Sequence, residues 1–191
     1  MNSCGLREFD DRQGWLQTLA SSTRMGTIGQ EQPFVPIYSD CMKTQSPGTK
    51  IRPASVTDVS AMFKIRASVG ENTMTSEELS AIGVTPESIA LAVSSAPCSW
   101  VATAEEEVVG FAMVDLDDAC LFALFVLPQY EGRGIGTCLT QACEQALFER
   151  HSSAWLETAK GSRAARLYRH LGWGNEVEIG GGDIRLEKQR H

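Results

Sequence analysis

Residues 120–147 read CLFALFVLPQYEGRGIGTCLTQACEQAL, and this stretch decides the fold. Cys120–Leu127 is an unbroken apolar run of strand length, which predicts a central strand covered on both faces. Pro128 ends the run, and Gly132, Gly134 and Gly136 follow it. From Ile135 onward, apolar residues recur every three or four positions, which predicts an amphipathic helix.

A strand that feeds a glycine-rich turn and then a helix is typical of an anion site. The first amides of a helix lack internal partners, and the helix dipole makes that end positive. Arg133 adds a cation and Thr137 a hydroxyl donor, so the turn suits a pyrophosphate. The dinucleotide fingerprint would need glycine at Thr137 or Leu139, and the Walker Gly-Lys-Ser/Thr is missing. Taken alone, the glycines could instead serve only to pack a tight turn.

A second segment, residues 156–173, reads LETAKGSRAARLYRHLGW and suits another strand and helix. Together the two segments resemble the GNAT acetyltransferase superfamily. The first is similar to its acetyl-CoA loop, Q/R-x-x-G-x-G/A after a hydrophobic strand. The second is similar to its helix A-x-x-L-Y-x-x-x-G-F/W. The resemblance covers about residues 50–190, and the paired motifs in this order are specific.

The resemblance implies roles for individual residues. Backbone groups of Leu124, Phe125 and Val126 would pair with the pantetheine arm of acetyl-CoA, in a slot where the central strand splays from the strand at 154–159. Tyr168 would protonate the departing thiolate. The pyrophosphate would be held by the loop and the first helical turn, namely Gly132, Arg133, Gly134, Ile135, Gly136 and Thr137.

The chain departs from the family pattern at two positions. Glu131 occupies the Gln/Arg position and brings a carboxylate beside a diphosphate, so we expect it to turn outward or to pair with Arg133. Gly161 replaces an asparagine that often precedes the second helix. A side-chain contact to CoA is therefore not expected there, although the Gly161-Ser162 backbone could take part.

Several candidate residues also have plain structural interpretations. Tyr168 could be a core aromatic at helical spacing from Leu171, but the family match favours the role of general acid. Glu157 could be an edge charge or the catalytic base, and some family members place a glutamate there. Water or Glu71 could do the same work. Asp115, Asp117 and Glu71 could line the amine site or face solvent.

The rest of the pattern predicts an α/β fold, a mixed β-sheet flanked by helices in the GNAT manner with splayed central strands. We expect an N-terminal extension over residues 1–48, flexible or lightly docked, and an acetyltransferase domain over 49–191. The expected order is strand, two helices, three strands, helix, strand, helix, strands. Its segments are a strand from Ile51, a helix at 55–67, capping signals at Thr75 and Thr85, strands at 100–104, 108–116, 120–127 and 154–159, a helix at 162–171, and strands at 176–179 and 184–187.

The amino-acid composition limits the kinds of molecule that the protein is expected to bind. The 191 residues carry a net charge of −7, which argues against following a nucleic-acid backbone. The six cysteines form no CxxC pair, so we expect buried free thiols, no metal site and a cytoplasmic enzyme. No signal peptide or membrane span is recognisable. The expected partner is a small-molecule or protein amine; a homodimer is left open.

The predicted function is an acetyl-CoA-dependent N-acetyltransferase that passes the acetyl group directly to an amine, without a covalent acetyl-enzyme. The alternative is an acyl-CoA-binding regulator or inactive interaction module with the same fold. The intact glycine loop and Tyr168 speak against that alternative. The acceptor and the acyl-chain length are not readable from the residues.

Overall fold

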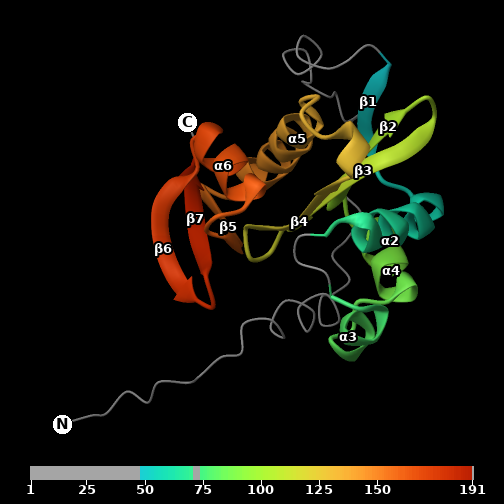
Figure 1. Ribbon diagram of the computed structural model, residues 1–191, viewed down its shortest axis with the longest axis horizontal. Helices are drawn as coiled ribbons and strands as arrows, with labels where there is room; N and C mark the ends of the chain where they lie inside the picture. The colour runs from blue at the N-terminus through green and yellow to red at the C-terminus, as the bar shows by residue number, and fades with distance from the viewer. Residues whose placement is uncertain (1–47, 71–73, 191) are drawn as a thin grey trace.

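A computed structural model describes residues 48–70 and 74–190. Its centre is a seven-stranded mixed sheet in the order β1-β2-β3-β4-β5-β7-β6. Helices α2, α3 and α4 lie on one side of the sheet, and α5 and α6 lie on the other (Figure 1). The strands are β1 (Thr49–Pro53), β2 (Ser99–Ala104), β3 (Glu107–Asp115), β4 (Cys120–Val126), β5 (Ser153–Ala159), β6 (Gly174–Gly180) and β7 (Asp183–Gln189). The helices are α2 (Val59–Ser68), α3 (Ser76–Ala81), α4 (Pro86–Ser95), α5 (Ile135–Arg150) and α6 (Arg163–His170).

The predicted fold class is confirmed, with one difference in element count. The capping signal at Thr75 opens a separate six-residue helix, α3, so between residues 48 and 98 the described chain has three α-helices rather than two. Thr75 and Glu78 exchange the hydrogen bonds of a capping box, at 2.7 and 3.2 Å. The predicted extension lies outside the described residues apart from Gly48, and so does Glu71.

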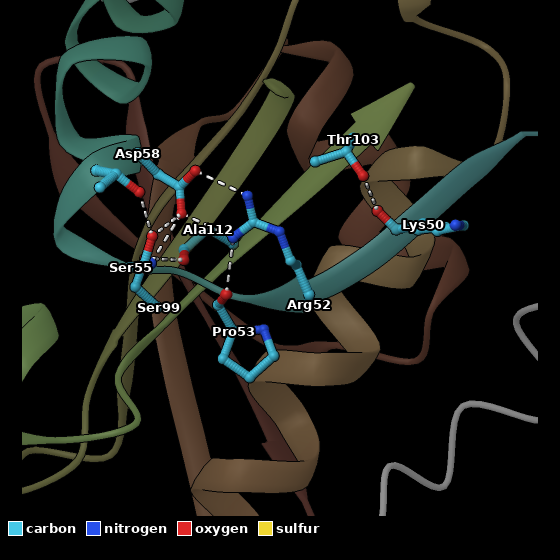
Figure 2. Close-up of polar contacts among 9 residues, drawn as sticks. Lys50, Arg52, Pro53, Ser55, Asp58, Ser99, Thr103 and Ala112 are labelled. Atoms are coloured by element: carbon cyan, nitrogen blue, oxygen red, sulfur yellow. Dashed lines mark hydrogen bonds and ion pairs between the residues drawn. The ribbon is translucent and has the colours of Figure 1, made fainter. Parts of the chain in front are cut away.

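The junction between β1 and α2 is tied by a buried carboxylate, Asp58, whose contacts Figure 2 shows. Arg52 on β1 donates to both Asp58 oxygens at 2.7 and 2.8 Å. Ser55 donates its backbone N–H to Oδ2 of Asp58 at 2.8 Å and its hydroxyl to the same oxygen at 2.7 Å. The Arg52 hydrogen bonds, more than any other cause, lower the pKa of Asp58 to about 2.

The two halves of the sheet part at its centre. The parallel pairing of β4 with β5 consists of a single register pair, Cys120 with Trp155. On its other side β4 stays paired with β3 from Cys120 to Val126, but the register skips Phe122. Such a bulge bends a strand, which fits the departure of β4 from β5. The predicted splay of the central strand is therefore present.

The strands on either side of the splay share one hydrophobic core with the helices. The buried apolar residues from α2, α4, α5, α6 and the central strands form one cluster. Within residues 48–70 and 74–190, no helix is long and apolar enough to cross a membrane.

Candidate functional site

The first candidate feature of a functional site is the edge of β4 that faces β5. Leu127, just beyond the strand, donates its amide to the carbonyl of Val109 on β3 at 2.9 Å. Backbone groups alternate in direction along a strand, so Phe125 also faces β3, where the register pairs it with Phe111. The N–H and C=O groups of Leu124 and Val126 face the slot, where an added extended chain could pair with them. The backbone of Phe125 is not available to such a chain.

The glycine loop joins β4 to α5 in the predicted place. The first hydrogen bond of α5 runs from the amide of Cys138 to the carbonyl of Gly134 at 3.1 Å. The amides of Ile135, Gly136 and Thr137 therefore precede the helical ladder and point out of the helix end. Gly132 and Gly134 have φ values of 73° and 80°, which a residue with a Cβ rarely adopts. The loop thus presents backbone amides with little side-chain bulk.

Gly136 has a different reason to be glycine. A Cβ built on it would lie 3.0 Å from Cδ2 of Leu167 on α6. Its missing side chain lets α5 and α6 approach each other. Helix packing therefore accounts for glycine at position 136, and the left-handed backbone accounts for glycine at positions 132 and 134.

The expected partner of Glu131 was wrong. Glu131 forms an ion pair with Arg163, the first residue of α6, and not with Arg133. Arg133 instead lies over the ring of Tyr130, with its guanidinium carbon 5.0 Å from the ring centroid. Position 163 looked like an ordinary helix residue in the sequence. Its pairing neutralises the carboxylate that seemed out of place beside a diphosphate.

Tyr168 lies on α6 and is buried. Its ring meets Trp173 edge to face at 6.0 Å. Trp173 in turn donates its indole N–H to Oε1 of Glu144 on α5 at 2.7 Å, and Lys188 on β7 donates to both oxygens of Glu144. Burial raises the pKa of the Tyr168 phenol well above its ordinary value, and the nearby Cys143 and Cys120 thiols add to this. The phenol is therefore held protonated, as a proton donor must be.

A cavity of about 440 Å³ adjoins the slot on the side of α2. Most of its wall is apolar, and Met62, Leu79, Phe111 and Met113 are typical of it. Phe122 and Ala123 contribute from the bulged part of β4, and residues 157–159 from the end of β5. Among the described residues, the polar or charged side chains on its wall are Arg66, Glu157, Thr158 and Asp183. No pattern in the sequence singles out Arg66 as a member of this group.

Glu157 lines that cavity and has a close partner. Arg185 on β7 donates to Oε1 of Glu157 from Nε at 3.0 Å and from a terminal nitrogen at 2.6 Å. The guanidinium of Arg185 also lies 3.9 Å from the ring centroid of Trp155. Neither of these hydrogen bonds uses Oε2. Glu157 is therefore a carboxylate on the cavity wall that is already paired with Arg185. The sequence analysis considered it as an edge charge or as the catalytic base, and its position combines features of both.

Asp115 and Asp117 lie away from the cavity wall. The buried Asp115 accepts the amides of Asp117 and Asp118 at 2.9 and 3.0 Å, which closes the turn between β3 and β4. That turn adjoins the paired ends of β4 and β5, where the sheet is closed. Of the two open interpretations of Asp115, neither holds, because its role is to cap this turn.

The cysteines in the described residues are poorly suited to act as nucleophiles. Cys98, Cys120 and Cys143 are free and buried, and burial raises the pKa of each thiol, that of Cys98 to about 11. Cys138 is disulfide-bonded, so the expectation of free thiols is wrong for this residue. The spacing of the cysteines along the chain gives no sign of this disulfide.

Comparison with known proteins adds a family match. Residues 71–173, more than half of the chain, match the model of the acetyltransferase (GNAT) family. A curated relative, the [ribosomal protein bS18]-alanine N-acetyltransferase of Haemophilus influenzae, is 37% identical over 76 residues. That alignment covers 38% of this chain and 51% of the relative, so the chain matches about half the length of that enzyme.

Solved structures share the fold at low sequence identity. The PaiA N-acetyltransferase of Thermoplasma acidophilum, solved in complex with coenzyme A, has a TM-score of 0.61 and 16% identity, covering 74% of this chain and 99% of its own. The ribosomal-protein-S18-alanine N-acetyltransferase of Escherichia coli has a TM-score of 0.55 and 22% identity, covering 74% and 93%. At these identities the likeness concerns the fold.

Proposed function

The chain belongs to the GNAT acetyltransferase family, and on that premise we propose that it transfers an acetyl group from acetyl-CoA directly to an amine. The observation that carries the proposal is the parting of β4 from β5 beyond the single pair Cys120–Trp155. Within residues 48–70 and 74–190, it leaves an unpaired strand edge that leads to the positive end of α5. The residues present fit an extended acyl-CoA chain ending in a pyrophosphate.

The donor would be held chiefly by backbone groups. Leu124 and Val126 offer N–H and C=O groups to the pantetheine amides, as a neighbouring strand would. The amides of Ile135, Gly136 and Thr137, with Arg133 nearby, bind the pyrophosphate. Gly132 leaves open space on this side, since a Cβ there would meet nothing within 4 Å. The pairing of Glu131 with Arg163 removes the charge that would oppose binding.

Acetyl-CoA supplies an activated thioester, and the protein supplies charge stabilisation and proton transfer. The N–H of Val126 faces the slot and is suited to stabilise negative charge on the carbonyl oxygen. Tyr168, protonated because it is buried, donates its proton to the departing thiolate. Glu157, through Oε2 or a water molecule, accepts the proton that the attacking amine must lose.

The cavity on the α2 side is the proposed amine site, because it reaches both the bulge of β4 and the end of β5. A cytoplasmic location belongs to the same proposal; the three free buried thiols favour it, and the disulfide at Cys138 counts against it. The buried thiols leave direct transfer as the route that the described residues favour over a cysteine-bound acetyl group.

Thiol release from acetyl-CoA over a panel of amines tests this function. We expect release that depends on one class of amine and matches the amount of acetylated product. The Tyr168→Phe variant serves as the matched control and should release thiol more slowly. Tight acetyl-CoA binding with no amine-dependent release would instead indicate an acyl-CoA-binding module.

A further inference from the structure

Arg66 is a half-buried cation on the cavity wall, and it forms no ion pair with any residue in 48–70 or 74–190. It lies on α2, and its guanidinium carbon is 4.9 Å from the ring centroid of Phe125. Its Nε is buried and has no hydrogen-bond partner within the described part of the chain. Burial lowers the pKa of Arg66, as expected for a charge removed from water without compensation. A stacking contact with Phe125 does not satisfy the N–H donors of a guanidinium.

The other charged groups in the described part of the wall do not serve as a counter-ion for Arg66. Glu157 is engaged by Arg185 through two hydrogen bonds. Asp183 begins β7 and has an interaction of its own. Leaving a buried donor unpaired costs about 1–3 kcal/mol, and more when the group is charged. A ligand carboxylate that met the guanidinium would recover this cost through two charge-assisted hydrogen bonds.

The rest of the wall specifies the body of such a ligand. Met62, Phe63, Leu79, Ile82 and Val84 present apolar surface from the α2–α4 side. The volume of about 440 Å³ lies in the range of small-molecule sites and leaves room for a single amino acid. The carboxylate oxygens of Glu157 at the end of β5 supply the polar surface that an amine requires.

We propose that the acceptor is a free amino acid with an apolar side chain, bound by its carboxylate to Arg66 and by its side chain to the apolar wall. This inference rests on the proposed function, because it places the acceptor in the cavity beside the acyl slot. It makes Arg66 the residue that selects acceptors carrying a carboxylate. A protein or peptide N-terminus, whose first residue has no free carboxylate, would lack that contact.

Ligand pairs test the proposal without altering the protein. Calorimetry with CoA present should give tighter binding of L-leucine than of L-leucinamide, and of L-methionine than of its amide, by roughly ten- to a hundredfold. Rates of acetylation should follow the same order. The amide has the less basic amine and is more often neutral, so intrinsic reactivity favours it. A preference for the free acid must therefore come from the site.

Arg66→Gln should abolish the preference, lowering affinity for leucine roughly ten- to a hundredfold while leaving leucinamide and acetyl-CoA binding unchanged. Arg66→Lys should keep part of the preference. Lys64→Gln removes a cation from the exposed face of the same helix and should change nothing. Thermal unfolding of each variant verifies that it is folded.

The outcomes separate this inference from the function beneath it. Equal binding of leucine and leucinamide, or faster acetylation of an alanine-initiated peptide, would overturn the carboxylate contact while acetyl transfer stood. Weaker acetyl-CoA binding in Arg66→Gln, with all acceptors affected alike, would assign Arg66 to the donor and also overturn it. Selective leucine binding without any acetyl transfer would support the site and refute the proposed function.

Discussion

The donor side and the acceptor side of this molecule are built in different ways. The donor side consists of backbone groups from one continuous segment, the end of β4, the glycine loop and the first turn of α5. The acceptor side is a cavity whose wall comes from α2, the α3 region, β3, β4, β5 and the start of β7. A backbone site leaves a local pattern of glycines, whereas a side-chain site is assembled only by the fold. The two sides should therefore respond differently to substitution.

The largest expected effect is on the donor side. Gly132→Asp places a carboxylate where open space faces the loop, and aspartate tolerates the left-handed backbone better than most residues. Affinity for acetyl-CoA should fall about a hundredfold, the upper range for a hydrogen-bonded charge. Calorimetry with CoA measures it. Gly132→Asn has a similar tolerance for the left-handed backbone and carries no charge, and an equal loss in both variants would contradict an anion site.

Substitution of Tyr168 tests whether donor binding and acetyl transfer can be separated. Tyr168→Phe removes only the phenol oxygen, so CoA binding should stay nearly intact while kcat falls on the order of tenfold or more. Since burial raises the pKa of Tyr168, the phenol is protonated throughout the neutral range and cannot serve as the base. Unchanged turnover in the Phe variant would return Tyr168 to a packing role beside Trp173.

Glu157 tests the acceptor side. Glu157→Gln keeps the shape of the side chain but removes its ability to take a proton, so kcat/KM should fall several-fold and the acidic limb of the pH–rate profile should flatten. Glu187→Gln, which changes a carboxylate on β7 outside the cavity wall, is the control. A profile for Glu157→Gln that overlays the parent's would leave Glu157 as a partner of Arg185 only.

The smallest effect is expected for Asp58 at the junction of β1 and α2, where a substitution should change stability but not activity. The lowered pKa of Asp58 means that its stabilising contribution is complete above about pH 4 and is lost as the pH falls towards about 2. Asp58→Asn should cost about 1 kcal/mol of unfolding free energy at neutral pH, with Arg52 partly exposed to solvent. Chemical denaturation should show a smaller difference in unfolding free energy between the parent and Asp58→Asn at pH 2.5 than at pH 7. The variant should keep the kcat of the parent. A constant difference would exclude the ion pair as its source.

Sequence reasoning worked where chemistry follows from contiguous residues. The apolar run at 120–127, the loop and α5 appeared as predicted, and so did the last two strands. It failed where residues distant in the chain meet. Arg163 reaches Glu131, Arg185 reaches Glu157, and Arg66 enters the cavity from a helix in which it looked like one more periodic position.

The alternation of backbone direction along β4 gives the sharpest refinement of the sequence-based site. Leu124, Phe125 and Val126 were expected to act together on the donor. The pairing of Leu127 with Val109 assigns Leu124 and Val126 to the slot and Phe125 to β3. No pattern in the sequence distinguishes the two directions, because they depend on where the β3–β4 register begins.

Residue-resolved amide hydrogen exchange by NMR, with and without CoA, tests this arrangement most directly. The account predicts new protection at Leu124 and Val126 on β4 and in the first turn of α5, at Ile135, Gly136 and Thr137. Phe125 and Ala123 should change little, because β3 already binds their amides. Unchanged exchange at Leu124 and Val126 in a protein that binds CoA would contradict a donor site between β4 and β5.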